Sequence, residues 1–133
     1  LDIKLENVLA GEFIEDNYRI KLCDFGLSNI GLSKINSRAG TFFYQGPEFF
    51  DQDEIDPFKA DIFSLGILFY LLTEQDNPFF DKDDRSIVSQ KRIGRYLFDP
   101  KNNFHDLIER CLDPDPTKRP TIDDVISFLT EDN

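Results

Sequence analysis

The stretch DPFKADIFSLGILFYLLTE, residues 56–74, decides the fold because it contains the longest apolar run of the sequence. Asp56 followed by Pro57 is a helix-start signal, since the Asp side chain caps the first turn and Pro fits inside it. We therefore expect a helix from Phe58 to Glu74. Its apolar residues fall on every face, which is typical of a helix in the middle of a larger body. The apolar run is too short to span a bilayer.

Patterns on either side of this helix predict a β-hairpin before it and further helices after it. Residues 8–10 are apolar and residues 19–23 alternate with period two, as strands do, and GEFIEDNY at 11–18 supplies a turn between them. Residues 26–40 show no sustained period and are expected to form a long loop. Two strands followed by helices predict an α+β fold with a mainly helical body. The further helices are expected at about residues 85–93, 104–112 and 122–129, the last with Thr121 and Asp124 in capping-box spacing.

The composition suits one acidic domain with reduced cysteines. The 133 residues are 40% hydrophobic and 14% aromatic, which is enough for a core. The formal net charge of -11 disfavours binding to nucleic acid and to anionic membranes, so we expect neither as a partner. Cys23 and Cys111 each lie in an apolar stretch, which fits free thiols in a reducing compartment. We therefore expect a cytoplasmic protein.

Two short motifs near the start of the chain carry the chemistry. The tripeptide DFG at 24–26 ends the second expected strand, where an Asp can hold a metal ion, although an ordinary strand-exit turn uses the same residue types. Asp2, Lys4 and Asn7 stand in the spacing D-x-K-x-x-N. Transfer of a phosphoryl group needs carboxylate-held Mg²⁺, a cation and a carboxylate aimed at the incoming hydroxyl. The two motifs together contain these groups.

These motifs and four that follow them resemble the C-terminal lobe of a eukaryotic-type serine/threonine protein kinase. Residues 2–7 are similar to the catalytic loop of that family, and residues 24–26 are similar to its DFG turn. The six motifs stand in family order and at family-like separations. The other four are GTFFYQGPE at 40–48, DIFSLG at 61–66, NPFFD at 77–81 and LDPDPTKRPT at 112–121.

The resemblance implies roles for the residues of the first two motifs. Asp2 would be the catalytic base or orienting carboxylate, and Lys4 would steady the transferring phosphate. Asn7 and Asp24 would bind Mg²⁺, so ATP and Mg²⁺ are the cofactors implied, and Phe25 would pack under the cleft. Protein substrates and ATP would be the partners, and a regulatory protein is a further candidate partner.

The resemblance also implies an activation segment that includes Gly26. Ser37 occupies the position of the usual phosphorylation site in that segment. Thr41 would hydrogen-bond Asp2 and Lys4, and with Lys4 it marks a serine/threonine kinase rather than a tyrosine kinase. The sequences IKLEN and DFGLS look closest to the calcium/calmodulin-dependent group.

Structural roles are implied for the helical part of the chain. Glu48 would pair with Arg119, which would tie the activation segment to the helical base. Asp61 would hydrogen-bond the backbone of the catalytic loop. Two residues depart from the family pattern, because Gly46 stands where Ala is usual and Phe63 where Trp is usual.

The resemblance places the chain as residues 1–133 of a partial kinase domain, from the catalytic loop to the last helix. We expect the ATP-holding N-terminal lobe to be absent and this piece to be inactive alone, whereas its parent would transfer the γ-phosphoryl group of ATP to Ser/Thr hydroxyls. Two alternatives remain. One is a pseudokinase or scaffold lobe that docks proteins, although a scaffold has no physical need for a metal-binding pair. The other is a helical interaction domain that matches the motifs by accident.

Phosphorylation of Ser37 is predicted to have little effect on activity. Leu1 stands where the family has an Arg that helps to bind a phosphate on the activation segment. Replacing Ser37 by Ala should therefore change the turnover rate of the complete protein only slightly in a kinase assay. A large loss that Ser37→Glu restores would contradict this prediction, and Lys34 or Arg38 would then be the residues that bind the phosphate.

Overall fold

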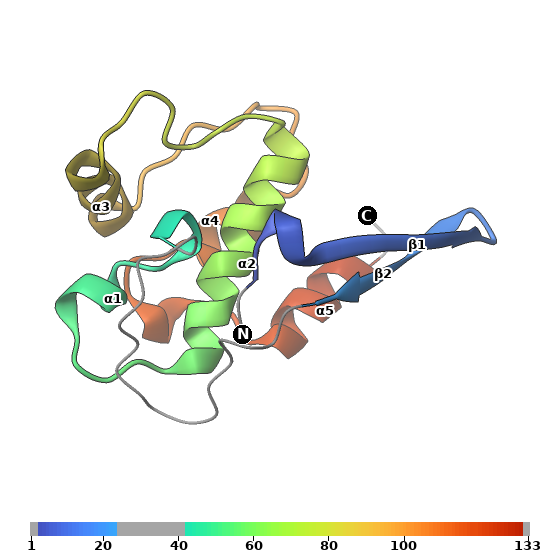
Figure 1. Ribbon diagram of the computed structural model, residues 1–133, viewed down its shortest axis with the longest axis horizontal. Helices are drawn as coiled ribbons and strands as arrows, with labels where there is room; N and C mark the ends of the chain where they lie inside the picture. Colours follow the sequence, from blue (N-terminus) through green and yellow to red (C-terminus); the bar gives the residue numbers. More distant parts are fainter. Residues whose placement is uncertain (1–2, 24–41, 132–133) are drawn as a thin grey trace.

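The computed structural model describes residues 3–23 and 42–131 of the chain. One long helix, α2, runs through the middle, with the other helices around it and a two-stranded hairpin that extends away from it (Figure 1). The expected α+β fold with a mainly helical body is confirmed. In chain order the elements are the 3₁₀ turn η1 (Leu5–Asn7), β1 (Val8–Ile14), β2 (Asn17–Leu22), η2 (Phe42–Tyr44), α1 (Glu48–Asp51), α2 (Pro57–Glu74), α3 (Asp84–Ile93), α4 (His105–Cys111), η3 (Pro116–Lys118) and α5 (Ile122–Thr130).

Helix α2 begins and ends as its sequence predicts. The Asp56 side chain accepts hydrogen bonds from the backbone N–H groups of Phe58 at 3.0 Å and Lys59 at 3.4 Å, which satisfies donors that have no partner within the helix. The helix ends where Gln75 adopts the left-handed conformation, with φ of 53°. Buried side chains occupy most of its length, so the expectation of a central, buried helix is confirmed.

The core lies between α2 and α4. Phe63 and Ile67 of α2 are fully buried, as are Leu107 and Ile108 of α4. The two helices approach each other closely at Gly66, because a Cβ atom there would lie only 2.8 Å from the Cβ of Cys111 and 2.9 Å from the Cδ2 of Leu112. Gly66 therefore permits a contact that any larger residue would obstruct.

The hairpin is longer than the sequence suggested. The segment 11–18, expected to be a loop, consists mostly of strand, and the turn is confined to Glu15 and Asp16, which both have positive φ. The strands pair antiparallel in the register Val8 with Leu22, with an irregularity between Ala10 and Phe13. Their extension is explained by the contact of Phe13 with Tyr18 across the strands, with ring centroids 4.8 Å apart.

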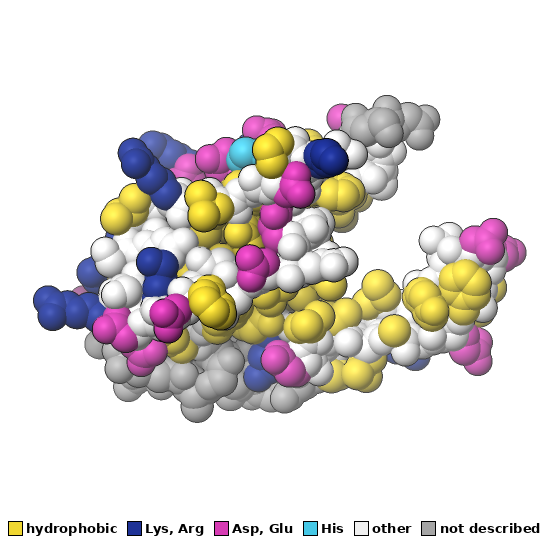
Figure 2. All heavy atoms as spheres, turned by 90° about the horizontal axis from the view of Figure 1, so that it is seen from above, with side chains coloured by type: hydrophobic (Ala, Val, Ile, Leu, Met, Phe, Trp, Pro, Cys, Tyr) yellow, Lys and Arg dark blue, Asp and Glu magenta, His cyan; other side chains and the backbone are white. Residues whose placement is uncertain are grey.

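Apolar side chains gather along this hairpin, where Figure 2 shows hydrophobic residues over the projecting arm. Both strands are exposed over nearly their whole length, unlike the strands of a buried sheet. Apolar surface of this extent is typical of regions that another part of a protein or a partner covers. The large apolar residues concerned are 41–63% exposed and comprise Leu9, Phe13, Ile14, Tyr18, Ile20 and Leu22.

The helices α3 and α5 begin with side-chain caps, of which only that of α5 was predicted. Asp83 caps α3 by accepting from the N–H of Ser86 at 2.8 Å, and α3 ends at Gly94, whose φ of 76° favours glycine. The predicted capping box of α5 is confirmed, since Thr121 and Asp124 each accept from the backbone N–H of the other. Within the residues described, none of the helices has both the length and the apolar character needed to cross a bilayer.

The close approach at Gly66 predicts that Gly66→Ala destabilises the protein. Alanine normally favours a helix over glycine by about 0.5–1 kcal/mol. Here its Cβ would collide with α4, and overpacking of a core costs about 1–3 kcal/mol, so the net change should be a loss. Urea unfolding measures this loss. Phe58→Ala, a change at a side chain of the same helix that is 76% exposed, is the control and should change stability little, so equal behaviour of the two variants would contradict the prediction.

Candidate functional site

The segment Ile3–Asn7 connects the core to the hairpin. Ile3 is buried in the main hydrophobic cluster, and the side chain of Asn7 is also buried. The Asn7 N–H donates to the Lys4 carbonyl at 3.0 Å, which closes the turn η1. The Asn7 carbonyl accepts from the N–H of Cys23 at 2.9 Å. Because Cys23 directly precedes Asp24 in the sequence, this bond joins the end of the first motif to the residue before the second.

Tyr44 links this segment to α2. Its hydroxyl accepts a hydrogen bond from the N–H of Leu5 at 3.1 Å, and its carbonyl accepts from the Ser64 hydroxyl at 2.9 Å. Tyr44 is itself buried. The turn η2 therefore touches the predicted catalytic loop on one side and the central helix on the other.

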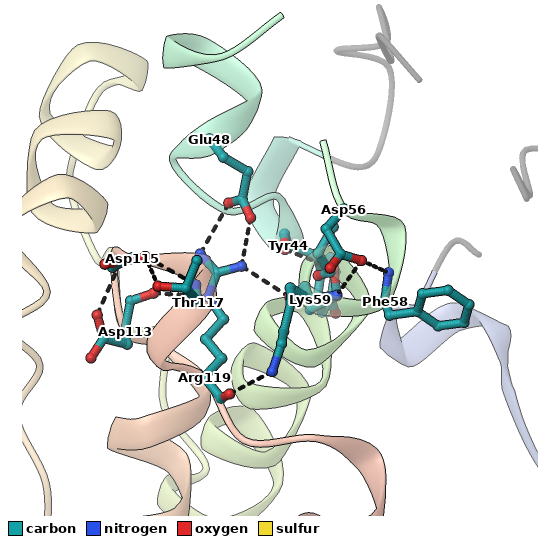
Figure 3. Close-up of polar contacts among 11 residues, drawn as sticks. Tyr44, Glu48, Asp56, Phe58, Lys59, Asp113, Asp115, Thr117 and Arg119 are labelled. Carbon is teal, nitrogen blue, oxygen red and sulfur yellow. Dashed lines mark hydrogen bonds and ion pairs between the residues drawn. The ribbon is translucent and has the colours of Figure 1, made fainter. Parts of the chain in front are cut away.

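Glu48 and Arg119 form the predicted ion pair, which lies in the interior (Figure 3). The guanidinium binds the carboxylate through both oxygens, with Nη1 to Oε2 at 2.6 Å and Nη2 to Oε1 at 3.0 Å. It also donates to the carbonyls of Asp113 at 2.8 Å and Lys59 at 2.9 Å. Both side chains are almost completely buried, so these bonds replace the water that the charges lost.

Gly46 makes room for this ion pair. A Cβ atom at Gly46 would lie 1.9 Å from the Glu48 Oε1 atom and 3.1 Å from the Arg119 Nη2 atom. The carboxylate thus occupies the space that the family's usual alanine would need. Glycine at position 46 therefore leaves room for the present conformation of the Glu48 side chain, which an alanine would displace.

Asp61 lies in the first half of α2 and is half-buried. Burial raises the pKa of its carboxyl to about 6, because the charged form is poorly solvated there. Its expected hydrogen bond to the catalytic-loop backbone stays a prediction.

Six of the residues proposed for the site lie outside the described residues, so their roles stay predictions. Over residues 3–23 and 42–131, no group of three or more His, Cys, Asp or Glu side chains is arranged to hold a metal ion. The six residues are Asp2, Asp24, Phe25, Gly26, Ser37 and Thr41.

Three features of the site were not predicted from the sequence, namely the helix α1, the hydrogen bond between Leu5 and Tyr44, and the burial of Lys91. The short helix α1 has only four residues, too few for a periodic pattern, and the bond from Leu5 to Tyr44 joins positions 39 residues apart. Lys91 lies in the polar sequence SQKR, which is typical of an exposed helix face, yet it is fully buried. The sequence contains no local signal for the burial of Lys91.

The central helix, the buried ion pair and the loop Ile3–Asn7 are the features expected of the helical lobe of a phosphotransferase. Residues 1–128 match the model of the protein kinase domain family. The chain belongs to the protein kinase domain family.

Its relatives include named serine/threonine kinases. The chain is 34% identical to a probable serine/threonine-protein kinase of Dictyostelium discoideum, over 98% of this chain and 17% of that protein. It is 34% identical to a putative serine/threonine-protein kinase of Saccharomyces cerevisiae, over 94% of this chain and 14% of that protein. NUAK family SNF1-like kinase 2 of Homo sapiens is 35% identical over 95% of this chain and 20% of that protein. The chain thus spans less than a quarter of the length of each.

Loss of the buried ion pair is predicted to be costly. Glu48→Gln leaves the Arg119 charge buried without an opposite charge, and such a change costs about 3–5 kcal/mol. The exposed pair of Arg92 with Asp51 is the matched control, because Asp51→Asn should cost no more than about 1 kcal/mol. Urea unfolding of both variants compares the two losses. Similar losses of unfolding free energy in the two variants would show that burial does not make the Glu48–Arg119 pair more stabilising than the exposed pair.

Proposed function

We propose that the protein containing this chain transfers the γ-phosphoryl group of ATP to serine or threonine hydroxyls of protein substrates. The observation that carries the proposal is the hydrogen bond from the Cys23 N–H to the Asn7 carbonyl. It brings the end of the catalytic-loop motif beside the residue that precedes Asp24. The catalytic-loop motif thus ends directly before β1, and the DFG motif follows the end of β2 in the sequence, so the two motifs that phosphoryl transfer requires flank one hairpin.

The residues present fit a magnesium ion. Asn7 and Asp24 offer an amide oxygen and a carboxylate, which are hard oxygen donors of the kind that Mg²⁺ prefers. Asn7 is buried, and hydrogen bonds of its backbone N–H and carbonyl groups hold its main chain in place. The position from which its side chain extends is therefore fixed. When bound, Mg²⁺ would neutralise charge on the phosphates of ATP.

The acceptor hydroxyl and the transferred group would be handled by the start of the loop. Asp2 would accept or orient the proton of the incoming hydroxyl, and the Lys4 ammonium would offset negative charge on the transferring phosphate. The burial of Ile3 between them supports these roles, because an anchored residue fixes the backbone from which both side chains extend.

Finer assignments belong to the same proposal. Membership of the calcium/calmodulin-dependent group is supported by the sequences DFGLS and IKLEN, and a regulatory protein would suit that group. A cytoplasmic location is supported by Cys111, a free thiol whose burial raises its pKa to about 12 and keeps it protonated.

Replacement of Asp2 by Asn in the complete protein tests the proposed chemistry. The turnover rate should fall by roughly 10²–10⁴-fold, since the group that accepts the proton is lost, while the KM for ATP should change little. Asp24→Asn should weaken binding of Mg²⁺-ATP as well. Steady-state phosphorylation of a Ser/Thr peptide library measures both effects. Unchanged phosphoryl transfer in Asp2→Asn would contradict the role proposed for Asp2. Absence of transfer in the unsubstituted protein would favour the alternative of a scaffold lobe that docks proteins.

A further inference from the structure

Lys91 on α3 is a buried cation that the proposed chemistry does not use. Its side chain is completely buried, and its Nζ atom donates a hydrogen bond to the carbonyl of Phe42 at 2.7 Å. Three aromatic rings surround the ammonium, with centroids 5.1 Å away for Phe42, 5.2 Å for Phe79 and 5.9 Å for Phe63. Ring faces attract a cation, so the three rings offset part of the cost of burying the ammonium.

Other charged or titratable groups also face this cage. Glu48 on α1 attracts the ammonium, although its carboxylate is already bound by Arg119. The guanidinium of Arg119 lies 4.8 Å from the Phe63 ring, so a second cation shares that ring. Tyr96, in the segment after α3, packs against Phe79 and has a buried hydroxyl whose pKa is raised by burial. The cage thus holds two cations and one carboxylate in the interior.

Phe42 is the first residue of η2, and η2 contacts the predicted catalytic loop. Two residues after Phe42, the Tyr44 hydroxyl accepts the hydrogen bond from the N–H of Leu5. Leu5 lies between Lys4 and Asn7, which the proposed function places at the transferring phosphate and the metal. A short turn fixed at Phe42 by Lys91 and at Tyr44 by Ser64 leaves little freedom for the contact with Leu5.

We propose that Lys91 is a positioning residue for phosphoryl transfer, which holds η2 through the Phe42 carbonyl and thereby fixes the backbone of the catalytic loop at Leu5. The inference rests on the proposed kinase activity. Among the described residues, Lys91 contacts the Phe42 carbonyl and the aromatic rings, so it would act on the catalytic loop through η2. Loss of its amine should therefore lower the rate of transfer without lowering the affinity for ATP.

Titration of Lys91 gives this role a pH signature. Burial lowers the pKa of the Lys91 amine to about 7, against the opposing effect of Glu48. A pKa this low means that the buried site holds the neutral amine more favourably than the ammonium. As the pH rises through about 7 the proton leaves, and the neutral amine can still donate to the Phe42 carbonyl. Below about pH 7 the contact carries the unfavourable burial of an ammonium, so the transfer rate should fall as the pH drops through about 7 because the contact of α3 with η2 weakens.

The experiment compares Lys91→Met with Ile87→Val in the complete protein. Met matches the length of the side chain but has no donor and no charge, whereas Ile87→Val removes one methyl group from a buried residue of the same helix that makes no polar contact with η2. We expect Lys91→Met to lower kcat by about tenfold, the effect of one hydrogen bond, with the KM for ATP unchanged. The contribution of Lys91 to the fall in kcat as the pH drops through about 7 should also disappear in Lys91→Met, while Ile87→Val keeps the pH profile of the unsubstituted protein.

Hydrogen exchange of the Leu5 amide separates this inference from the proposed activity. In Lys91→Met the exchange should be faster than in Ile87→Val, whether or not the protein is an active kinase. A kcat and a Leu5 exchange rate that change no more than in Ile87→Val overturn the inference. If Lys91→Met does not fold, the unsubstituted protein still decides, because a kcat that does not fall as the pH drops through about 7 also overturns the inference. Absence of activity with faster Leu5 exchange would refute the kinase function and leave the link from Lys91 to the loop standing.

Discussion

The structure depends on the buried ion pair of Glu48 with Arg119. Its partners are 71 residues apart, and the guanidinium also binds the backbone of α2 at Lys59 and the segment before η3 at Asp113. In return, the Lys59 ammonium donates to the Arg119 carbonyl at 2.7 Å. Burying two charges is unfavourable unless nearly every donor and acceptor finds a partner, and here the contacts come from three separate parts of the chain. The pair can therefore form only when α1, α2 and the C-terminal segment are correctly assembled together.

The helical part of the fold was predictable because its signals are local. The start of α2 is marked by Asp56 with Pro57, and the start of α5 by Thr121 with Asp124. The capping hydrogen bonds join residues no more than three positions apart. The hairpin was underestimated because Gly11, Asp16 and Asn17 all suggest a turn in its middle segment, whereas the turn is formed by Glu15 and Asp16 alone. The contacts that extend the strands are made across the hairpin, so a reading along the chain could not detect them.

The candidate site was predictable only in its residue types. The resemblance to protein kinases identified Glu48 and Arg119 as partners, and their geometry agrees with that expectation. The bond of Lys91 to Phe42 was not predictable, because it joins positions 49 residues apart and because a lysine in a polar stretch normally faces water. Packing of α3 against η2 decides the burial of this lysine, and packing partners are not encoded in the local pattern.

The space beside Gly46 has a consequence for the way this protein tolerates sequence change. The alanine usual at this position and the present conformation of Glu48 cannot coexist, since a Cβ there would lie 1.9 Å from the carboxylate. The two positions are therefore epistatic, and the residue acceptable at one depends on the side-chain conformation of the other. Consensus design, which imports the common residue of a family as a stabilising change, would at Gly46 strain the buried contact that assembles the lobe. Gly46→Ala would be tolerated only if the side chains of Glu48 and Arg119 adopted a different conformation at the same time.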